Sequence, residues 1–223
     1  MKGSTFSKSA ATWAVISWGA QHRKRLHLVF RRPNFSSWLA RGAWITAALA
    51  VVLLLQLLGT LARLPIHGLL LAPGLVLALL LPAHCPLAMR QCRGRALWQP
   101  VRGVVRAIFT AVATGGAMLL PFVGVLCPEH MPYFAATTAL GALGWLITAG
   151  LDFGLVHGSP EARAGAAELR RGAWRGLAWG GALLTLLGLL APLVGAWITL
   201  PVLAGPLLFV HAWLGAGQSV PQT

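Results

Sequence analysis

The chain has 223 residues, of which 57% are hydrophobic and only 10% are charged, and its mean hydropathy is +0.73. This composition excludes an ordinary soluble domain and is typical of a membrane protein with several helical spans. The net charge of +14 would favour nucleic acid as a partner in a soluble protein, but the basic residues lie in short blocks between apolar runs. That pattern is typical of cytoplasmic loops, so we expect a bilayer with anionic headgroups, and no nucleic acid, as the partner.

Residues 1–41 form the first predicted region, in which tryptophans and phenylalanines alternate with lysines and arginines. We expect an amphipathic interfacial segment at the level of the headgroups, divided by Pro33. The remainder, 42–223, is predicted to be a single membrane domain. It begins with the runs 42–62 and 64–89, which contain no Asp, Glu, Lys or Arg. As helices, both are about 30 Å long or longer, enough to cross the hydrocarbon layer.

A short motif recurs in the second half of the chain, as LLPFVG at 119–124 and as LAPLVG at 190–195. Each copy combines a proline with a glycine three residues later, which predicts a helix break inside apolar sequence. The apolar run 107–120 that precedes the first copy would be only about 21 Å long as a helix, too short for a full crossing. We therefore expect two in-membrane hairpins, 107–151 and 176–214. The candidate residues at their turns and along an anion pathway are Pro121, Gly124, Pro192, Gly195, Thr114 and Thr185.

The predicted fold is thus an all-α integral membrane protein with two long transmembrane helices and two proline-broken hairpins. A conventional bundle of six spans is the alternative, and the half-length runs favour the hairpins. Seventeen of the eighteen basic residues fall before the first helix, in the linker 90–106 or in the loop 152–175, so we expect both termini and these loops to be cytoplasmic. Within the last loop, Ser159 and Pro160 predict the start of a short helix.

A polar cluster is expected at the cytoplasmic edge, where an unpaired carboxylate would be costly. We predict that Asp152 pairs with an arginine of the loop that follows it. The cluster consists of Asp152, His157, Arg170 and Arg171.

The cysteines, Cys85, Cys92 and Cys127, lack the paired spacing of a metal site. A ligand set of His84, Cys85 and Cys92 is the alternative, but it has no repeated CxxC or HxxxH element. We therefore expect no metal and no cofactor.

Several longer segments resemble a known family. They are AMLLPFVGVLCPEHMPYF, LITAGLDFGLVHG and ELRRGAWRGLAWGGALLTLLGLLAPLVGAWITLPVLAGPLL. The last 120 residues, roughly, are similar to the CysZ-type sulfate permeases, which belong with the etoposide-induced membrane proteins. The positions that match the family pattern are Pro121, Gly124, Asp152, Arg170, Arg171, Gly180, Pro192 and Pro201. The resemblance implies a homo-oligomeric, multi-pass protein of the bacterial inner membrane that moves sulfate or a related anion into the cytoplasm.

Two functions remain open from the residues. A helix that restarts after a break aims free N–H groups and a positive dipole end at a cavity, which favours an anion permease. The alternative is a non-transporting membrane interaction protein, in which Gly172, Gly176 and Gly180 pack helices. We do not expect an enzyme, because the apolar runs contain no paired carboxylates, no His-Glu motif and no GxSxG.

Overall fold

The computed structural model describes residues 34–91, 96–98, 101–154, 157 and 159–220. Regular structure in these ranges is entirely helical. Most of the predicted interfacial segment, 1–33, lies outside them. The chain divides into two compact units, Met1–Leu77 and Ala78–Thr223, which are described separately below.

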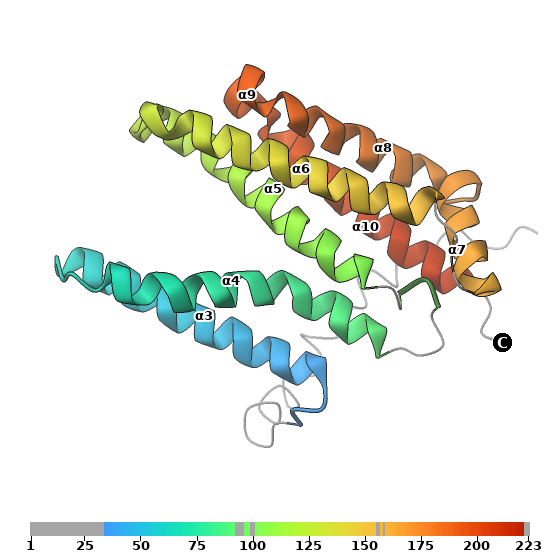
Figure 1. The fold of residues 1–223 in the computed structure, drawn as a ribbon, viewed down its shortest axis with the longest axis horizontal. Helices are drawn as coiled ribbons and strands as arrows, with labels where there is room; N and C mark the ends of the chain where they lie inside the picture. Colours follow the sequence, from blue (N-terminus) through green and yellow to red (C-terminus); the bar gives the residue numbers. More distant parts are fainter. Residues whose placement is uncertain (1–33, 92–95, 99–100, 155–156, 158, 221–223) are drawn as a thin grey trace, which may run out of the picture. The chain divides into compact units, whose positions relative to one another are not determined.

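The first unit contains helix α3, Trp38–Leu61, and the start of helix α4, His67–Arg90, which together cover the two predicted spanning runs (Figure 1). A tight turn joins them. The Arg63 N–H donates to the Thr60 carbonyl at 3.1 Å and the Leu64 N–H to the Gly59 carbonyl at 2.8 Å, which is the pattern of a Schellman motif. This motif needs a left-handed residue, and Arg63 supplies it with φ of 54°. Pro65 follows directly and prevents α3 from continuing.

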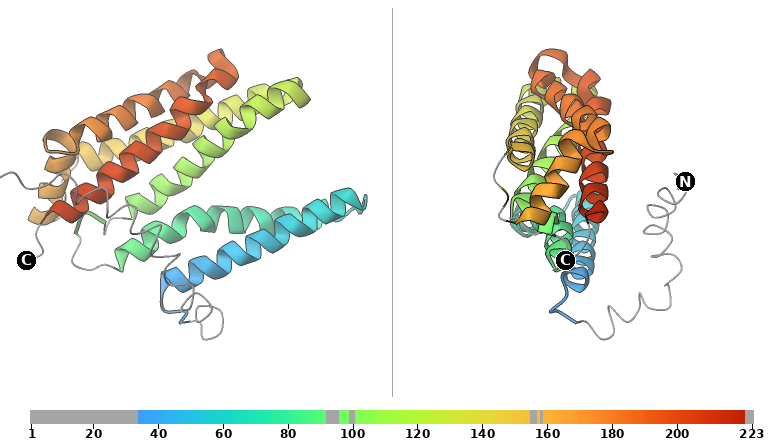
Figure 2. Two further views of the ribbon diagram at one scale, coloured as in Figure 1. Left: turned by 180° about the vertical axis from the view of Figure 1, so that it is seen from behind. Right: turned by 90° about the vertical axis from the view of Figure 1, so that its right-hand side faces the viewer.

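In its described residues, the second unit contains the end of α4, from Ala78, and four long helical arms that form a bundle (Figures 1 and 2). Helices α5, α6 and α10 are continuous, and the fourth arm is built from α8, η3 and α9. The bounds are η1 Ala96–Trp98, α5 Arg102–Leu126, η2 Pro128–His130, α6 Met131–Gly154, α7 Pro160–Arg171, α8 Arg175–Leu186, η3 Leu187–Leu190, α9 Ala191–Val194, η4 Gly195–Ile198 and α10 Thr199–Ser219. The predicted start of α7 is confirmed, because the Ala162 N–H donates to the Ser159 hydroxyl at 3.1 Å and Pro160 is the first helical residue.

Glycines set how closely these helices approach. A Cβ added to Gly141 of α6 would lie 2.5 Å from the Ala113 nitrogen of α5, and one added to Gly181 of α8 would lie 2.6 Å from the Gly205 carbonyl of α10. Both helix pairs therefore pack backbone against backbone, as small residues allow in membrane helices. Gly176 and Gly180, which the alternative hypothesis used for helix packing, pack against no helix of this chain's described residues, since a Cβ at either position would meet nothing within 4 Å.

The predicted break at Pro121 and Gly124 is also wrong, because α5 runs without interruption through both residues to Leu126. A proline inside a helix leaves the carbonyl four residues earlier without its N–H donor. Here that carbonyl belongs to Ala117, and it accepts a hydrogen bond of 2.9 Å from the Thr199 hydroxyl of α10. A donor from another helix thus replaces the missing one, so the helix has no need to end. The chain turns later, at Cys127 and η2.

The break at Pro192 and Gly195 is confirmed. Gly195 has φ of 65° and ψ of −134°, a conformation that glycine alone adopts readily, and α9 ends directly before it. The two copies of the motif therefore have different structures. In the first, a side chain elsewhere satisfies the backbone, whereas in the second a positive φ reverses the chain.

Five helical stretches in the described residues are long and apolar enough to cross a membrane. They are Ala40–Leu61, His67–Arg90, Arg102–Leu126, Pro128–Gly154 and Arg175–Ser219, the last of which contains the turn at Gly195. This content indicates a membrane protein. The expectation of half-length arms is wrong for the first hairpin, because α5 has 25 residues and a length of about 37 Å.

Candidate functional site

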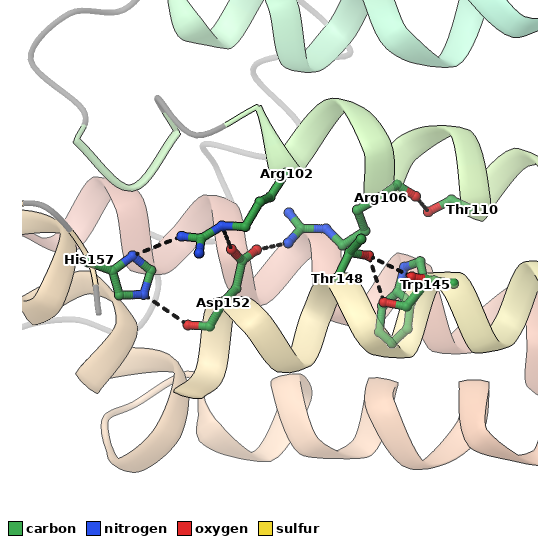
Figure 3. Close-up of polar contacts among 8 residues, drawn as sticks. Arg102, Arg106, Thr110, Trp145, Thr148, Asp152 and His157 are labelled. Atoms are coloured by element: carbon green, nitrogen blue, oxygen red, sulfur yellow. Dashed lines mark hydrogen bonds and ion pairs between the residues drawn. The ribbon is translucent and has the colours of Figure 1, made fainter. Parts of the chain in front are cut away.

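A buried ionic cluster lies where the start of α5 meets the end of α6 (Figure 3). Arg102 and Arg106 are four residues apart, so both side chains project from the same face of α5. Because α6 runs antiparallel to α5, this face meets Asp152, in the last turn of α6. Arg106 is only 3% exposed and Asp152 only 4%. Charged groups are buried to this degree only when they are paired.

Arg106 has partners on two helices. Its Nη1 donates to the Asp152 Oδ2 in a buried ion pair with α6. Its guanidinium also lies over two rings of α10, 4.7 Å from the Trp213 ring centre and 5.0 Å from that of Phe209. Cation–π attraction is strengthened when the cation is desolvated, so the rings compensate for part of the lost hydration. Arg106 thereby ties α5 to both α6 and α10.

Arg102 and His157 complete the cluster at its more accessible end. The Arg102 Nε lies 3.4 Å from the Asp152 Oδ1, and its Nη2 lies 3.4 Å from the His157 Nδ1. The His157 Nε2 lies 3.1 Å from the Asp152 main-chain carbonyl. Arginine only donates, so His157 Nδ1 is the acceptor and the proton of a neutral imidazole sits on Nε2, which donates to the carbonyl. His157 thus satisfies one of the carbonyls left open at the end of α6.

The cluster contains two guanidinium groups and one carboxylate, so with a neutral His157 it carries a net charge of +1. The positive end of the α5 dipole adds to this charge, because Arg102 is the first residue of the helix. A net positive charge in a region of reduced hydration attracts small anions. Arg102 is the more accessible guanidinium, with 25% of its side chain exposed, and so the one that an anion from solution can reach.

A cavity of about 250 Å³ adjoins the cluster within the second unit. Among the described residues that line it, Arg106 is the charged one, and the other polar groups come from Thr110 and Cys85. The remaining lining residues are apolar or small, namely Pro82, Pro86, Met89, Gly103, Ala107, Ala111, Val210 and Trp213. The Thr110 hydroxyl donates to the Arg106 carbonyl at 2.9 Å.

The structure brings together only part of the predicted polar cluster. Asp152 and His157 are neighbours, but Asp152 pairs with Arg102 and Arg106 of the preceding helix, so the prediction of a partner in the following loop is wrong. Arg170 and Arg171 are exposed at the end of α7. They lie on the last turn of α7, where their positive charges interact with the negative end of the helix dipole and not with Asp152.

The candidate hairpin residues lie away from this cluster. Gly124 and Gly195, from the two copies of the motif, both lie against Met131, whose Cε would be 2.6 Å from a Cβ at Gly195. Pro121 and Pro192 are exposed. The two threonines turn their hydroxyls to their own helices: Thr114 donates to the Thr110 carbonyl at 2.7 Å and Thr185 to the Gly181 carbonyl at 2.8 Å.

The two arginines were not predicted as site residues, because Arg102 and Arg106 were assigned to a solvated linker. The signal that would have found them is their four-residue spacing directly before an apolar run, which places two charges on one helix face. A second polar group was also missed, at the α5–α6 turn, where ligand atoms of Cys127, Glu129 and His130 lie within 4.8 Å of one another.

Comparison with known proteins finds no relative of this chain. No family model matches the chain, and no match is found among the curated proteins or the solved structures. The resemblance to sulfate permeases therefore depends on the sequence segments quoted above, and any inference of function depends on the chemistry of the cluster.

Proposed function

We propose that this chain is an inner-membrane anion permease that binds a small inorganic anion at Arg102, beside the Arg106–Asp152 ion pair, and moves it into the cytoplasm. One observation carries the proposal, namely the net positive charge of the buried cluster that these arginines form with Asp152. A guanidinium offers paired N–H donors that match the oxygens of sulfate and related oxyanions. The family resemblance makes sulfate the first substrate to test.

Asp152 has a defined part in this proposal. Its carboxylate occupies the Arg106 donors in the absence of substrate, which keeps two like charges from facing each other unpaired. An arriving anion competes for Arg102, the partner held at 3.4 Å, and leaves the Arg106 pair intact. Binding is then reversible, as transport requires.

The arrangement in the membrane is part of the same proposal. The 25 residues of α5 are long enough to cross the bilayer completely, so we place Arg102 at the cytoplasmic side and Cys127 at the opposite side. Both termini and α7 are then cytoplasmic. In a chain with Cys85→Ser and Cys92→Ser, an impermeant maleimide applied from outside should label Cys127. A cysteine introduced by Arg163→Cys, at an exposed site on α7, should react only after permeabilisation, and the reverse result would contradict this orientation.

Transport is tested with the purified chain in proteoliposomes, measuring uptake of radiolabelled sulfate, thiosulfate and sulfite. We expect uptake above that of empty vesicles and at least a tenfold loss with Arg102→Gln, because the accessible donor is removed. Arg102→Lys should retain part of the activity, since the charge remains. Arg171→Gln is the matched control, because Arg171 is exposed and the arginine partners of Asp152 are Arg102 and Arg106, and it should leave uptake unchanged.

A non-transporting membrane interaction protein is the second candidate function. It is favoured by the threonine hydroxyls, which in α5, α6 and α8 donate to carbonyls of their own helices and so do not line a path. The uptake assay separates the two functions. Absence of uptake for all three anions, with the protein correctly inserted, would select this second candidate.

A further inference from the structure

The turn between α5 and α6 gathers three side chains with different donor atoms. Cys127 follows the last residue of α5 and its N–H donates to the Val123 carbonyl at 2.9 Å. Pro128 then begins the single turn of η2, which is closed by a hydrogen bond of 2.9 Å from the His130 N–H to the Cys127 carbonyl. This turn brings the Cys127 and His130 ligand atoms within 4.8 Å of each other.

Glu129 adds a carboxylate to this face. The His130 Nδ1 lies 3.1 Å from the Glu129 Oε1, and one ligand atom from each of the three residues lies within 4.8 Å of the others. All three side chains are exposed, and the Cys127 thiol is free. The group is independent of the arginine cluster, which lies at the opposite end of α5, about 37 Å away along the helix.

We propose that Cys127, Glu129 and His130 form a binding site for a zinc-class divalent cation. A thiolate, an imidazole and a carboxylate are the ligands that zinc prefers, whereas calcium and magnesium take oxygen ligands. In a tetrahedral zinc site, neighbouring donor atoms are about 3.3 to 3.8 Å apart. The present donors lie within 4.8 Å of one another on exposed side chains, whose rotation can bring them to that spacing.

The charges also balance. A thiolate and a carboxylate together neutralise a divalent cation, and the imidazole binds as a neutral ligand. Three protein ligands leave the fourth position to water, so the site accepts and releases its ion more readily than a closed structural site. The turn is already held by its own hydrogen bonds, so the ion does not have to order the backbone when it binds.

An ion bound at this site would affect the start of α6 and its contact with the second hairpin. Met131, the next residue, begins α6 and lies against Gly195, the turn of the other hairpin. A cation held by residues 127–130 fixes the start of α6 and with it the contact between the two hairpin ends. Zinc should therefore raise the melting temperature of the chain.

The test uses the full chain in detergent, with any affinity tag removed, titrated with cobalt as a spectroscopic probe and then with zinc. We expect one equivalent of cobalt, a thiolate-to-cobalt charge-transfer band, and displacement by zinc. Cys127→Ser should abolish the band, and both Cys127→Ser and His130→Ala should weaken zinc binding at least tenfold and remove the thermal shift. Cys85→Ser and His67→Ala are matched controls, because they remove one exposed cysteine and one exposed histidine elsewhere.

A second readout follows the thiol itself. In a chain with Cys85→Ser and Cys92→Ser, zinc should slow alkylation of Cys127, and His130→Ala should abolish this protection. A charge-transfer band that persists in Cys127→Ser, or zinc protection that survives His130→Ala, would overturn the site. None of these readouts depends on transport, so the site and the permease proposal can fail independently.

Discussion

The role of the hydrogen bond from Thr199 to the Ala117 carbonyl can be tested by removing the hydroxyl, with and without the proline that makes it necessary. Pro121 cannot donate to that carbonyl, and Ala117 is fully buried, so water cannot replace the Thr199 hydroxyl. Thr199→Val keeps the shape of the side chain and removes the donor. The carbonyl is then left without a partner in an apolar environment.

The expected cost follows from this environment. Leaving a buried polar group unsatisfied costs about 1–3 kcal/mol, and side-chain hydrogen bonds between membrane helices are worth about 0.6 kcal/mol on average, with a maximum near 1.7. We therefore expect Thr199→Val to lower the free energy of unfolding by about 1–2 kcal/mol. In a Pro121→Ala background the backbone at position 121 regains its N–H, so the same substitution should cost less than about 0.5 kcal/mol.

The assay is reversible unfolding in a denaturing detergent for the wild type, the two single variants and the double variant. Thr114→Val is the matched control, because its hydroxyl donates to a carbonyl of its own helix that also has a regular N–H donor; it should change stability by less than about 0.5 kcal/mol. An equal cost of Thr199→Val in both backgrounds would refute the link between the hydroxyl and the proline. Pro121→Ala by itself should leave the topology unchanged, because α5 is already continuous.

Three further predictions use the same assay or the yield of folded protein. Gly195→Ala should destabilise the protein by about 1–3 kcal/mol, because φ is 65° and the added Cβ meets Met131. Gly124→Ala, inside a helix, should be neutral or stabilise by up to about 1 kcal/mol. Equal effects of the two substitutions would contradict the structural difference between the two motif copies. Gly181→Ala should lower the free energy of unfolding by about 1–3 kcal/mol, because the added Cβ pushes α8 away from α10. Gly180→Ala, whose Cβ would have no atom within 4 Å, should not lower it. A comparable loss of stability in both variants would argue against this packing. Asp152→Asn leaves the buried Arg106 charge without its carboxylate partner and should cost about 3–5 kcal/mol, seen as lost folded protein. Normal yield would show that the ion pair is dispensable.

The local features of this fold could be predicted from the sequence. Long runs without charge specify membrane-length helices, because their backbone groups are satisfied within each helix whatever lies around them. The start of α7 depends on Ser159 and Pro160, which act on their immediate neighbours. The turn at Gly195 is likewise local, since only glycine adopts its backbone angles without strain.

The candidate site was only partly predictable. Asp152 and His157 were identified because both are polar residues beside a long apolar run, and their contact spans five residues of sequence. Arg106 was assigned to a solvated linker because an arginine near a helix start usually reaches water. Its burial depends on Asp152, which is 46 residues away, and on two rings of α10.

Pro121 shows most clearly the difference between what the local sequence determines and what depends on tertiary contacts. By its sequence alone it should break a helix, and the identical spacing at Pro192 does coincide with a turn. The difference lies in Thr199, which is 82 residues from Ala117 and reaches its carbonyl only because α10 packs against α5. Whether a proline ends a helix depends on whether a donor is available for the carbonyl it leaves open, and here only the tertiary structure supplies that donor.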